Sequence, residues 1–291
     1  MKNIVAIIVT YNVGNDFLNR IDTLKDKVNE IVVVDNGSNN ETLKILDSIK
    51  DKIVLFKLNE NKGIAYALNR GIEYAIDKGY QWILTLDHDS IVEESMISNM
   101  LETYEGIDYE TKEKIVMITP VHIEEKNYSN EYVNKDKSWE YVLTEITSGS
   151  LTKTSYYKEN LYDEDLFIDL VDHDFCLNIN RQGYKIIQVK SAVLIHNLGD
   201  SIKKKMLGVT VTPTNHSSVR RYYMSRNRFY IWNKYKNEFP QWVSKDKKRF
   251  VSELIKVVLF EEKKSEKIKM TIRGIKDFKN GKVGKLSDNN K

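Results

Sequence analysis

The first ninety residues alternate between short apolar runs and segments with helical spacing. Apolar runs occupy residues 4–9, 31–34, 53–58 and 82–86, and helical spacing follows Gly14 and spans 42–49 and 64–76. Runs that are apolar at every position are typical of strands buried on both faces, and strands separated by helices form parallel sheets. The pattern predicts an α/β fold in which a mostly parallel, Rossmann-like sheet is flanked by helices.

The pattern changes in the second half of the chain. A further strand is expected at 115–119, and two short strands are expected within 184–195. Gly149 follows a short run and marks a place where the backbone is tight. Residues 217–236 and 248–279 have helical spacing.

The charge balance reverses near residue 200. Residues 1–200 contain 21 Lys/Arg and 34 Asp/Glu, whereas residues 201–291 contain 24 and 8. Such an asymmetry indicates that the two parts face different partners. We therefore expect one domain over 1–200 and a basic, mainly helical region over 201–291.

Composition narrows the class of protein. No apolar run approaches the roughly 18 residues of a membrane-spanning helix, and the first run is too short for a signal peptide. Cys176 is the single cysteine, which excludes an intrachain disulfide and a cysteine-rich zinc site and suits a reducing compartment. We expect a cytoplasmic protein with no nucleic-acid partner.

Polar clusters follow each of the first four apolar runs. They are Thr10-Tyr11-Asn12, Asp35-Asn36-Gly37-Ser38, Asn59-Glu60-Asn61-Lys62-Gly63 and Asp87-His88-Asp89-Ser90. In an open parallel sheet, ligands bind outside the carboxyl ends of the strands. We therefore expect the four clusters to form one site.

Asp87 and Asp89 end the fourth run with one residue between them. Because side chains at positions i and i+2 of a strand point the same way, the two carboxylates would converge on one point. Such oxygen ligands suit Mg²⁺ or Mn²⁺, and Mg²⁺ is often held by one or two carboxylates together with substrate phosphates. Alternatively, Asp89 or Ser90 caps a following helix. The position after the fourth strand favours the metal site.

Three further residues are candidates for chemistry. Asp35 either accepts hydrogen bonds from a base or ribose or is a residue of the Asp-Asn-Gly-Ser turn. Asp172 lies among apolar residues with Asp169 and Asp174, where a carboxylate is suited to act as a general base. Alternatively, Asp172 and Asp174 supply favourable charge at the start of a helix. His196 follows an apolar strand and is either a metal ligand or a structural residue.

Taken in order, these motifs resemble those of the family 2 inverting glycosyltransferases, which have the glycosyltransferase-A fold. The motifs that carry this resemblance are Thr10-Tyr11-Asn12, Val34-Asp35-Asn36-Gly37-Ser38, Asn61-Lys62-Gly63-Ile64-Ala65 with Asn69-Arg70-Gly71, and Leu86-Asp87-His88-Asp89-Ser90. Others are similar to the bacterial rhamnosyltransferase branch, namely Thr147-Ser148-Gly149-Ser150, Phe167-Ile168-Asp169 with Val171-Asp172, Gly183-Tyr184-Lys185, His196-Asn197-Leu198-Gly199-Asp200, and Arg221-Tyr222-Tyr223 with Arg226-Asn227. The resemblance covers about residues 3–235.

The resemblance implies roles for residues that bind the donor. Asp35 would contact the nucleotide base. The donor pocket would be lined by Thr10, Tyr11, Asn12, Asn61, Gly63 and His88. Asp87 would contact the ribose or the metal, Asp89 would bind the metal on the diphosphate, and His196 would complete the metal or diphosphate site.

The resemblance also implies the reaction. Asp172 would deprotonate the acceptor hydroxyl, and Gly149 and Trp139 would lie on the acceptor side. The reaction would be metal-dependent transfer with inversion at the anomeric carbon. The first expectation for the donor is dTDP-rhamnose, with a UDP-hexose as the alternative. The acceptor would be a growing cell-surface polysaccharide of the cell wall or capsule, or a lipid-linked saccharide.

The chain departs from the branch at two places that bear on the donor sugar. Asp174-Phe175-Cys176-Leu177-Asn178 stands where the branch commonly has an acid followed by Trp-Cys-Leu-Arg. His88 replaces a commoner glutamine. The fold and the reaction are compatible with both changes, but the donor sugar is left open.

Other classes of protein fit less well. Asp87-His88-Asp89-Ser90 also resembles the nucleophile loop of haloacid-dehalogenase-like phosphatases, which have that loop after their first strand rather than their fourth. No G-x-G-x-x-G turn follows an early strand, which excludes a dinucleotide oxidoreductase. A non-catalytic sugar-binding module would not need Asp172 together with the paired carboxylates.

The basic C-terminal region has two apolar stripes. One consists of Phe250, Leu254, Val257 and Val258, and the other of Ile268, Ile272 and Ile275, with lysines between them. Three interpretations remain open: a helical pair packed on the first domain, peripheral contact with an anionic inner membrane, and a homodimer interface.

Overall fold

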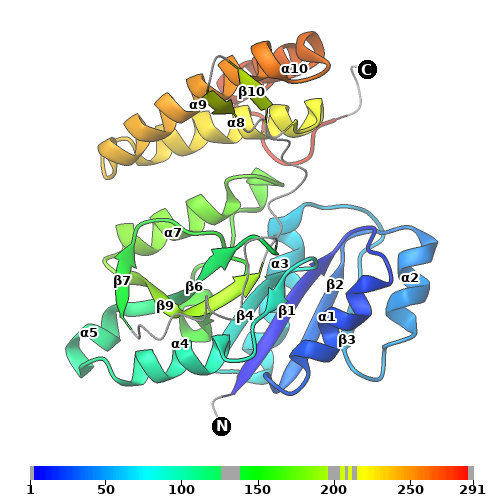
Figure 1. Ribbon diagram of the computed structural model, residues 1–291, viewed down its shortest axis with the longest axis vertical. Coiled ribbons are helices and arrows are strands. Elements are labelled where there is room, and N and C mark those ends of the chain that lie inside the picture. The colour runs from blue at the N-terminus through cyan, green and yellow to red at the C-terminus, as the bar shows by residue number, and fades with distance from the viewer. Residues whose placement is uncertain (1–2, 126–137, 196–203, 207–208, 212–214, 288–291) are drawn as a thin grey trace. The chain divides into compact units, whose positions relative to one another are not determined.

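The computed structural model describes residues 3–125, 138–195, 204–206, 209–211 and 215–287 (Figure 1). The chain divides into two compact units. We call the first, Met1–Glu164 and Asp172–Asn197, the sheet unit, and the second, Asp165–Val171 and Leu198–Lys291, the helical unit. The short segment Asp165–Val171, which precedes residue 200, therefore belongs to the helical unit.

Four parallel strands form the first half of the sheet. They are β1 (Ile4–Thr10), β2 (Glu30–Asp35), β3 (Val54–Lys57) and β4 (Trp82–Asp87), in the spatial order β3-β2-β1-β4. The registers place Thr10 opposite Asp35, and Val9 opposite Asp87. The carboxyl ends of β1, β2 and β4 therefore lie together at one edge, as expected from the polar clusters.

The second half of the sheet contains both parallel and antiparallel pairs. Beyond β4 the order continues with β8 (Ser150–Lys153), β6 (Ile115–Ile123), β9 (Lys185–Ile195) and β5 (Ile91–Val92), and β7 (Trp139–Val142) also pairs with β9. The two short strands expected within 184–195 are one strand, β9. Gln188 and Lys190 interrupt its apolar run, but both are only half-buried, so the strand continues through them.

Three helices share a core with one face of the sheet. They are α1 (Asp16–Leu24), α2 (Asn40–Asp47) and α4 (Met96–Glu105). Successive side chains of a strand point to opposite faces, and Ile4, Ala6 and Ile8 of β1 lie in this core. Each of these three side chains is at most 4% exposed.

The opposite face is covered by α3 (Ile64–Lys78). Gly71 of α3 approaches β1 so closely that a Cβ atom at this position would lie 2.6 Å from Cγ2 of Ile7. Three other helices complete the sheet unit: α5 (Tyr109–Lys114), α6 (Thr154–Tyr157) and α7 (Val171–Arg181), whose first residue belongs to the helical unit. The expected α/β fold with flanking helices is confirmed (Figure 1).

The helical unit is built from α8 (Ser218–Tyr235), α9 (Pro240–Phe260) and α10 (Lys264–Lys279). The helical spacing expected over 248–279 belongs to two helices, α9 and α10, between which the chain turns through Lys263 with a left-handed φ of 48°. The helices α8 and α10 pack most closely at Gly274, where a Cβ atom would lie 2.3 Å from Oγ of Ser225. A short hairpin, β10 (Lys204–Met206) and β11 (Val209–Val211), also belongs to this unit. Among the helices that the structure describes, none combines the length and apolarity of a membrane span.

Candidate active site

Asp35 is the centre of a buried hydrogen-bond network at the ends of β1 and β2. Its Oδ1 accepts hydrogen bonds from the hydroxyls of Thr10 at 3.1 Å and Ser38 at 2.5 Å, and its Oδ2 accepts one from the backbone N–H of Ser38 at 3.0 Å. The side chain has no exposed surface. Asp35 thus holds the turn after β2, as its turn interpretation expects. A direct contact with a nucleotide base remains a prediction.

The loops after β2 and β3 are joined by two asparagines. Asn36 donates to the side-chain oxygen of Asn61 at 3.3 Å and accepts from the backbone N–H of Lys62 at 2.9 Å. Asn61 Oδ1 also accepts from the N–H of Gly63 at 3.0 Å. Gly63 has φ 94° and precedes the first turn of α3. Asn61 and Gly63 are therefore held in place beside the network of Asp35.

Tyr11 and Asn12 follow β1 at the rim of the same network. The backbone N–H of Asn12 donates to Ser38 Oγ at 2.9 Å, and its side-chain oxygen accepts from the N–H of Asn39 at 2.9 Å. Asn12 adopts a left-handed φ of 55°, which asparagine tolerates better than most residues. The side chain of Tyr11 is 46% exposed. An exposed aromatic ring beside a network of fixed polar groups can stack on a flat ligand such as a base.

The backbone around Asp87 and Asp89 differs from the expectation. Strand β4 ends at Asp87, and His88 and Asp89 form a turn in which the N–H of Ser90 donates to the carbonyl of Asp87 at 3.2 Å. The argument that both carboxylates extend from one strand is therefore wrong. The helix-cap alternative is also wrong, because residues 91–92 form β5 and the next helix, α4, begins only at Met96. Asp87 is exposed, and His88 and Asp89 are half-buried.

A tight turn at Thr147–Ser150 connects Asp87 with Asp172. The backbone N–H of Asp87 donates to Ser148 Oγ at 3.0 Å, and Ser148 Oγ also bonds to Ser90 Oγ at 2.8 Å. In the preceding residue, Thr147 Oγ1 donates to Asp172 Oδ1 at 3.0 Å. Two adjacent residues therefore hold the Asp87 turn and the carboxylate of Asp172.

Gly149 makes this turn possible. Its φ is 81°, and a Cβ atom there would lie 2.9 Å from side-chain atoms of Leu194 and Pro120. Its N–H donates to the carbonyl of Thr85 in β4 at 2.7 Å. The expectation of a tight backbone at Gly149 is confirmed. A role for Gly149 on the acceptor side stays a prediction.

Asp172 lies in the first turn of α7, together with Asp174. Asp172 is half-buried and Asp174 is buried. A carboxylate in the first turn interacts favourably with the helix dipole, so the structural interpretation of these acids holds. It does not conflict with catalysis by Asp172, because a general base must also be fixed in orientation. Cys176, one turn further on, is buried, and burial raises the pKa of its thiol well above the usual range, which makes it a poor nucleophile.

Trp139, a predicted site residue, is not brought to this cluster. Trp139 lies on the outer strand β7 opposite Val189, where it packs against the hydrophobic core and meets the ring of Tyr141 edge to face. No hydrogen bond or ring contact between Trp139 and the Gly149 turn occurs within the described residues. His196 lies outside the described residues, so its role as a metal ligand stays a prediction.

Sequence reasoning missed several residues that organise the site. Ser38, Thr147 and Ser148 each bond to a predicted residue or to its backbone, and Arg20 of α1 lines a narrow hollow beside Asp87 and His88. The signal for Ser38 and the serine–threonine turn was their place within the quoted motifs. Arg20 carries no such signal, because it lies within an amphipathic helix and approaches the site only through packing.

The metal chemistry of the cluster depends on few protein ligands. Within the described residues, no group of three or more His, Cys, Asp or Glu side chains is arranged to hold a metal ion. Asp87 and Asp89 offer two carboxylates at the end of β4. Two carboxylates fit Mg²⁺ or Mn²⁺ when phosphate oxygens of a substrate supply other ligands.

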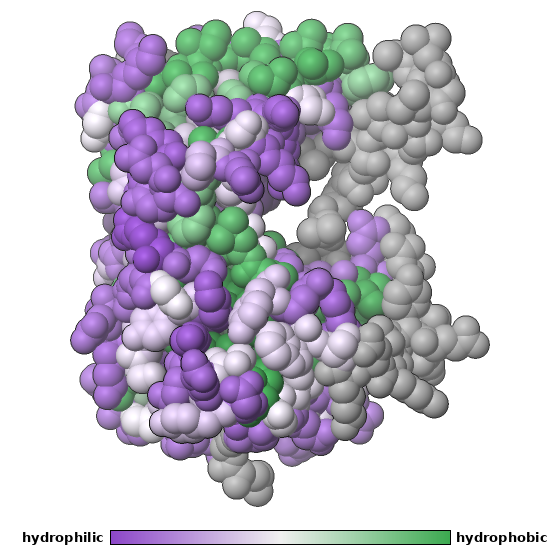
Figure 2. Space-filling view, turned by 90° about the vertical axis from the view of Figure 1, so that its left-hand side faces the viewer, coloured by the Kyte–Doolittle hydropathy of each residue, from purple (hydrophilic) through white to green (hydrophobic). Residues whose placement is uncertain are grey.

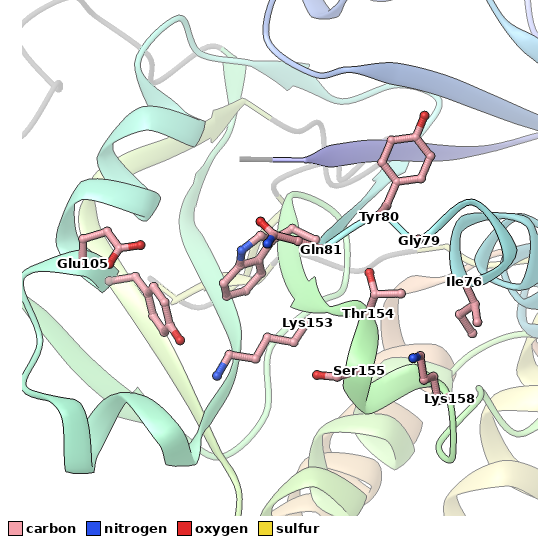
Figure 3. Close-up of a pocket in the computed structure, with 11 residues that line it drawn as sticks. Ile76, Gly79, Tyr80, Gln81, Glu105, Lys153, Thr154, Ser155 and Lys158 are labelled. Carbon is pink, nitrogen blue, oxygen red and sulfur yellow. The ribbon is translucent and has the colours of Figure 1, made fainter. Parts of the chain in front are cut away.

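A cavity lies at the other end of β4. It has a volume of about 520 Å³ and is lined by Trp82 at the start of β4 and by Tyr104 of α4. Lys153 at the end of β8 and Thr154 at the start of α6 also line it (Figure 3). Burial raises the pKa of Tyr104 to about 12 and lowers the pKa of Lys153 below its usual value. None of the predicted site residues lines this cavity. The candidate site is instead the open edge formed by the carboxyl ends of β1, β2 and β4.

The segment before α7 has a strained backbone that the helical unit holds. Phe167, Asp169 and Leu170 have left-handed φ values of 62°, 65° and 63°. Asn227 donates to the carbonyls of residues 166, 168 and 169 at 2.8–2.9 Å. Burial raises the pKa of Asp169, although Arg220, at 3.0 Å, lowers it. The quoted motifs at 167–169 and 226–227 thus meet in space.

Comparison with known proteins places the chain in a family. The model of "Glycosyl transferase family 2" matches residues 5–170. The chain is 30% identical to the dTDP-rhamnosyl transferase RfbF of Shigella flexneri over 259 residues, which are 84% of this chain and 83% of RfbF. It is also 30% identical to poly-beta-1,6-N-acetyl-D-glucosamine synthases of Staphylococcus aureus, but over only 36% of this chain and 26% of theirs.

Solved structures share the fold. GalNAc-T7, crystallised with UDP, GalNAc and Mn²⁺, matches with a TM-score of 0.60 and 15% identity over 84% of this chain and 50% of its own. TarS of S. aureus matches with a TM-score of 0.52 and 16% identity over 80% of this chain and 40% of its own. The family match covers β1 to β8 and the clusters at the ends of β1 to β4, and it ends just before Asp172. The expected glycosyltransferase-A fold is confirmed. The chain belongs to the family 2 glycosyltransferases.

Proposed function

We propose that this glycosyltransferase moves L-rhamnose from dTDP-rhamnose to a hydroxyl of a saccharide, free or lipid-linked, during synthesis of a cell-surface polysaccharide. The donor is proposed from the similarity to RfbF, which extends over most of both chains. A UDP-hexose is the alternative donor, because His88 and the segment 174–178 depart from the rhamnosyltransferase pattern.

One observation carries the mechanism. Thr147 Oγ1 bonds to Asp172, and the adjacent Ser148 bonds to the backbone of Asp87. The candidate base and the candidate diphosphate-binding turn are therefore fixed to the same two residues. Direct displacement at one carbon requires a fixed geometry between the base and the site that binds the leaving group.

The reaction is a single displacement. Asp172 accepts the proton of the acceptor hydroxyl while the acceptor oxygen forms a bond to the anomeric carbon of the donor. The bond between that carbon and the diphosphate oxygen breaks, and the diphosphate leaves with the electron pair. Attack from the side opposite the leaving group inverts the configuration at the anomeric carbon.

The remaining residues bind and orient the donor. The network of Thr10, Asp35 and Ser38 shapes the nucleotide end of the site, and Asn61 and Gly63 fix the loop beside it. Asp87 and Asp89, together with His196 as proposed from the family resemblance, would hold Mg²⁺ or Mn²⁺. When bound, the cation offsets the negative charge of the leaving diphosphate.

Substitution of Asp172→Asn tests the base. We expect the rate of transfer to fall by about 10³-fold, the effect typical of losing a general base, while the affinity for dTDP, measured by calorimetry, changes less than twofold. Transfer is measured as release of nucleotide diphosphate, with dTDP-rhamnose and UDP-hexoses compared as donors, and the anomeric configuration of the product is determined by NMR.

The exposed Asp51→Asn is the matched control, because it removes the same charge from a surface turn of the same unit. Near-normal transfer by the Asp172→Asn variant would refute the assignment of the base. Faster release from a UDP-hexose than from dTDP-rhamnose by the unmodified chain would refute the proposed donor but leave the base untouched.

A further inference from the structure

The C-terminal helices expose an apolar surface that the proposed reaction does not use. Five aliphatic side chains form it, each at least half exposed: Val251 at 55%, Ile255 at 53%, Val258 at 50% and Leu259 at 51% on α9, and Ile272 at 60% on α10. We call these five residues the aliphatic stripe. Figure 2 shows apolar surface running along one edge of the helical unit.

The stripe is specific to this part of the chain. Among the described residues of the sheet unit, the large exposed apolar side chains are tyrosines, apart from Leu161. The four residues on α9 are spaced i, i+4, i+7 and i+8, which places them on one face of the helix. The residues of α9 that are buried, Val243, Asp246 and Val257, lie on a different face.

Exposed charged side chains in the part of the chain that carries the stripe are almost all basic. The exposed Lys and Arg side chains within 240–287 are Lys245, Lys247, Lys248, Arg249, Lys263, Lys264, Lys269, Lys276, Lys279, Lys282 and Lys285. In the same range the exposed acids are Glu262 and Glu266. An exposed apolar face bordered by lysines is the arrangement of a helix that lies in the surface of an anionic bilayer.

Other acidic side chains of this part of the chain are buried inside the helical unit. Glu261 is buried between Arg221 at 2.7 Å and Lys267 at 3.0 Å. Asp246 is buried and accepts from the indole N–H of Trp232 at 2.8 Å. Because its inward face takes up these carboxylates, the hairpin of α9 and α10 presents its aliphatic side chains and most of its positive charge to the outside.

We infer that the aliphatic stripe and its lysines dock the protein on a membrane of anionic phospholipid. The charge pattern selects this occupant over a second copy of the chain. A symmetric dimer through the stripe would bring two sets of exposed lysines together, and like charges at an interface disfavour association. A bilayer with anionic headgroups can bind both the aliphatic stripe, through its acyl chains, and the exposed lysines, through its headgroups.

Vesicle binding by the full chain tests the inference. The triple variant Val251→Ser, Ile255→Ser and Leu259→Ser is compared with the unmodified chain in sedimentation with vesicles of phosphatidylglycerol and phosphatidylcholine. We expect the unmodified chain to bind mixed vesicles at least tenfold more strongly than pure phosphatidylcholine vesicles. We expect the triple variant to lose at least tenfold of that binding.

The matched control is Leu161→Ser, which removes an exposed aliphatic side chain from the sheet unit. It should bind vesicles as the unmodified chain does. Release of nucleotide diphosphate and circular dichroism should be unchanged in both variants, which separates failed docking from failed folding or failed catalysis. Equal vesicle binding by the triple variant would overturn the inference. A dimer in light scattering that the triple variant abolishes would overturn it too, by assigning the stripe to a second copy.

Discussion

The two units of this chain bury different kinds of side chain. The sheet unit buries aliphatic residues of β1, β2 and β4, and its buried polar side chains are mostly hydroxyls and amides. The helical unit buries seven charged side chains among its described residues: Arg221, Arg226, Arg228, Asp246, Glu261, Lys267 and Asp277. The interior of the first unit is therefore mainly apolar, whereas the interior of the second combines charged side chains with buried aromatic ones such as Tyr222 and Trp232.

This difference bears on which kind of side chain each unit leaves at its surface. In the sheet unit, apolar packing fills the interior, so carboxylates such as Asp87 remain at the open edge, where a ligand can reach them. In the helical unit, ion pairs share the interior with aromatic and aliphatic side chains, while other aliphatic residues such as Ile255 lie outside. Buried ion pairs are costly to break but are not necessarily stabilising compared with apolar packing. The helical unit therefore keeps apolar surface available without needing it for its own core.

The largest expected effect on stability comes from breaking a buried ion pair. Replacing Glu261→Gln removes the carboxylate that lies 3.0 Å from the buried Lys267 and 2.7 Å from the buried Arg221. Arg221 keeps the more distant carboxylate of Glu253 at 3.7 Å. We expect a loss of about 3 kcal/mol in the free energy of unfolding of the helical unit. Hydrogen exchange, followed by mass spectrometry, should speed up in peptides of α8 and α10 and stay unchanged in β1.

Glu262→Gln is the control for this experiment, because Glu262 is adjacent but exposed. Its effect should be within about 0.5 kcal/mol, as for most surface substitutions. If Glu261→Gln were as mild as Glu262→Gln, the helical unit would not depend on its buried charges, and the contrast between the units would disappear.

A smaller effect is expected from a single hydrogen bond in the sheet unit. Thr147→Val keeps the shape of the side chain but removes the hydroxyl that bonds to Asp172. Losing a hydrogen bond to a charged group costs about 1.5 kcal/mol, so kcat should fall about tenfold. KM for the donor should change little, because Thr147 is not placed in the donor network.

Thr147→Ser separates positioning from packing. It keeps the hydroxyl and should restore most of kcat, although it removes a methyl group. A kcat for Thr147→Ser as low as that of Thr147→Val would show that packing at Thr147, rather than the bond to Asp172, supports the reaction.

Acid should also destabilise the helical unit. Burial lowers the pKa of His216 from 6.5 to about 4. Between these values the unfolded chain binds a proton that the folded unit does not, so stability falls as the pH falls through this window. The melting temperature of the unit should therefore decrease from pH 7 to pH 4, and less so in His216→Asn.

Glu253 extends the same trend to lower pH. Burial by itself would raise its pKa, but the hydrogen bond and charge of Arg228 outweigh burial and lower the pKa below 4.5. The stability that this pair contributes is present above the usual pKa of glutamate and is lost as the pH falls through the folded pKa. If the melting temperature of the helical unit rose on acidification, the expected contributions of both His216 and Glu253 would be wrong.

Much of the sheet unit could be predicted because its signals are local. Residues 4–9 and 31–34 are apolar at every position, and both form buried parallel strands. Clusters after parallel strands lie at the same edge, so the edge that carries Thr10, Asp35 and Asp87 follows from the chain direction. Prediction failed at the turn after Asp87, because strand periodicity does not reveal where a strand stops pairing.

The amino-acid sequence by itself determined the family, the strand order along the chain and the polar clusters, because these depend on neighbours in the chain. Only the tertiary structure decided that Thr147 bonds to Asp172, and that Glu261 is buried while Ile255 is exposed. Residues 254 and 257 share one predicted stripe, yet Val257 is buried and Leu254 is half-buried. The reason is physical: burial and hydrogen bonding depend on which distant segments fill the space around a side chain, and periodicity carries no information about those segments.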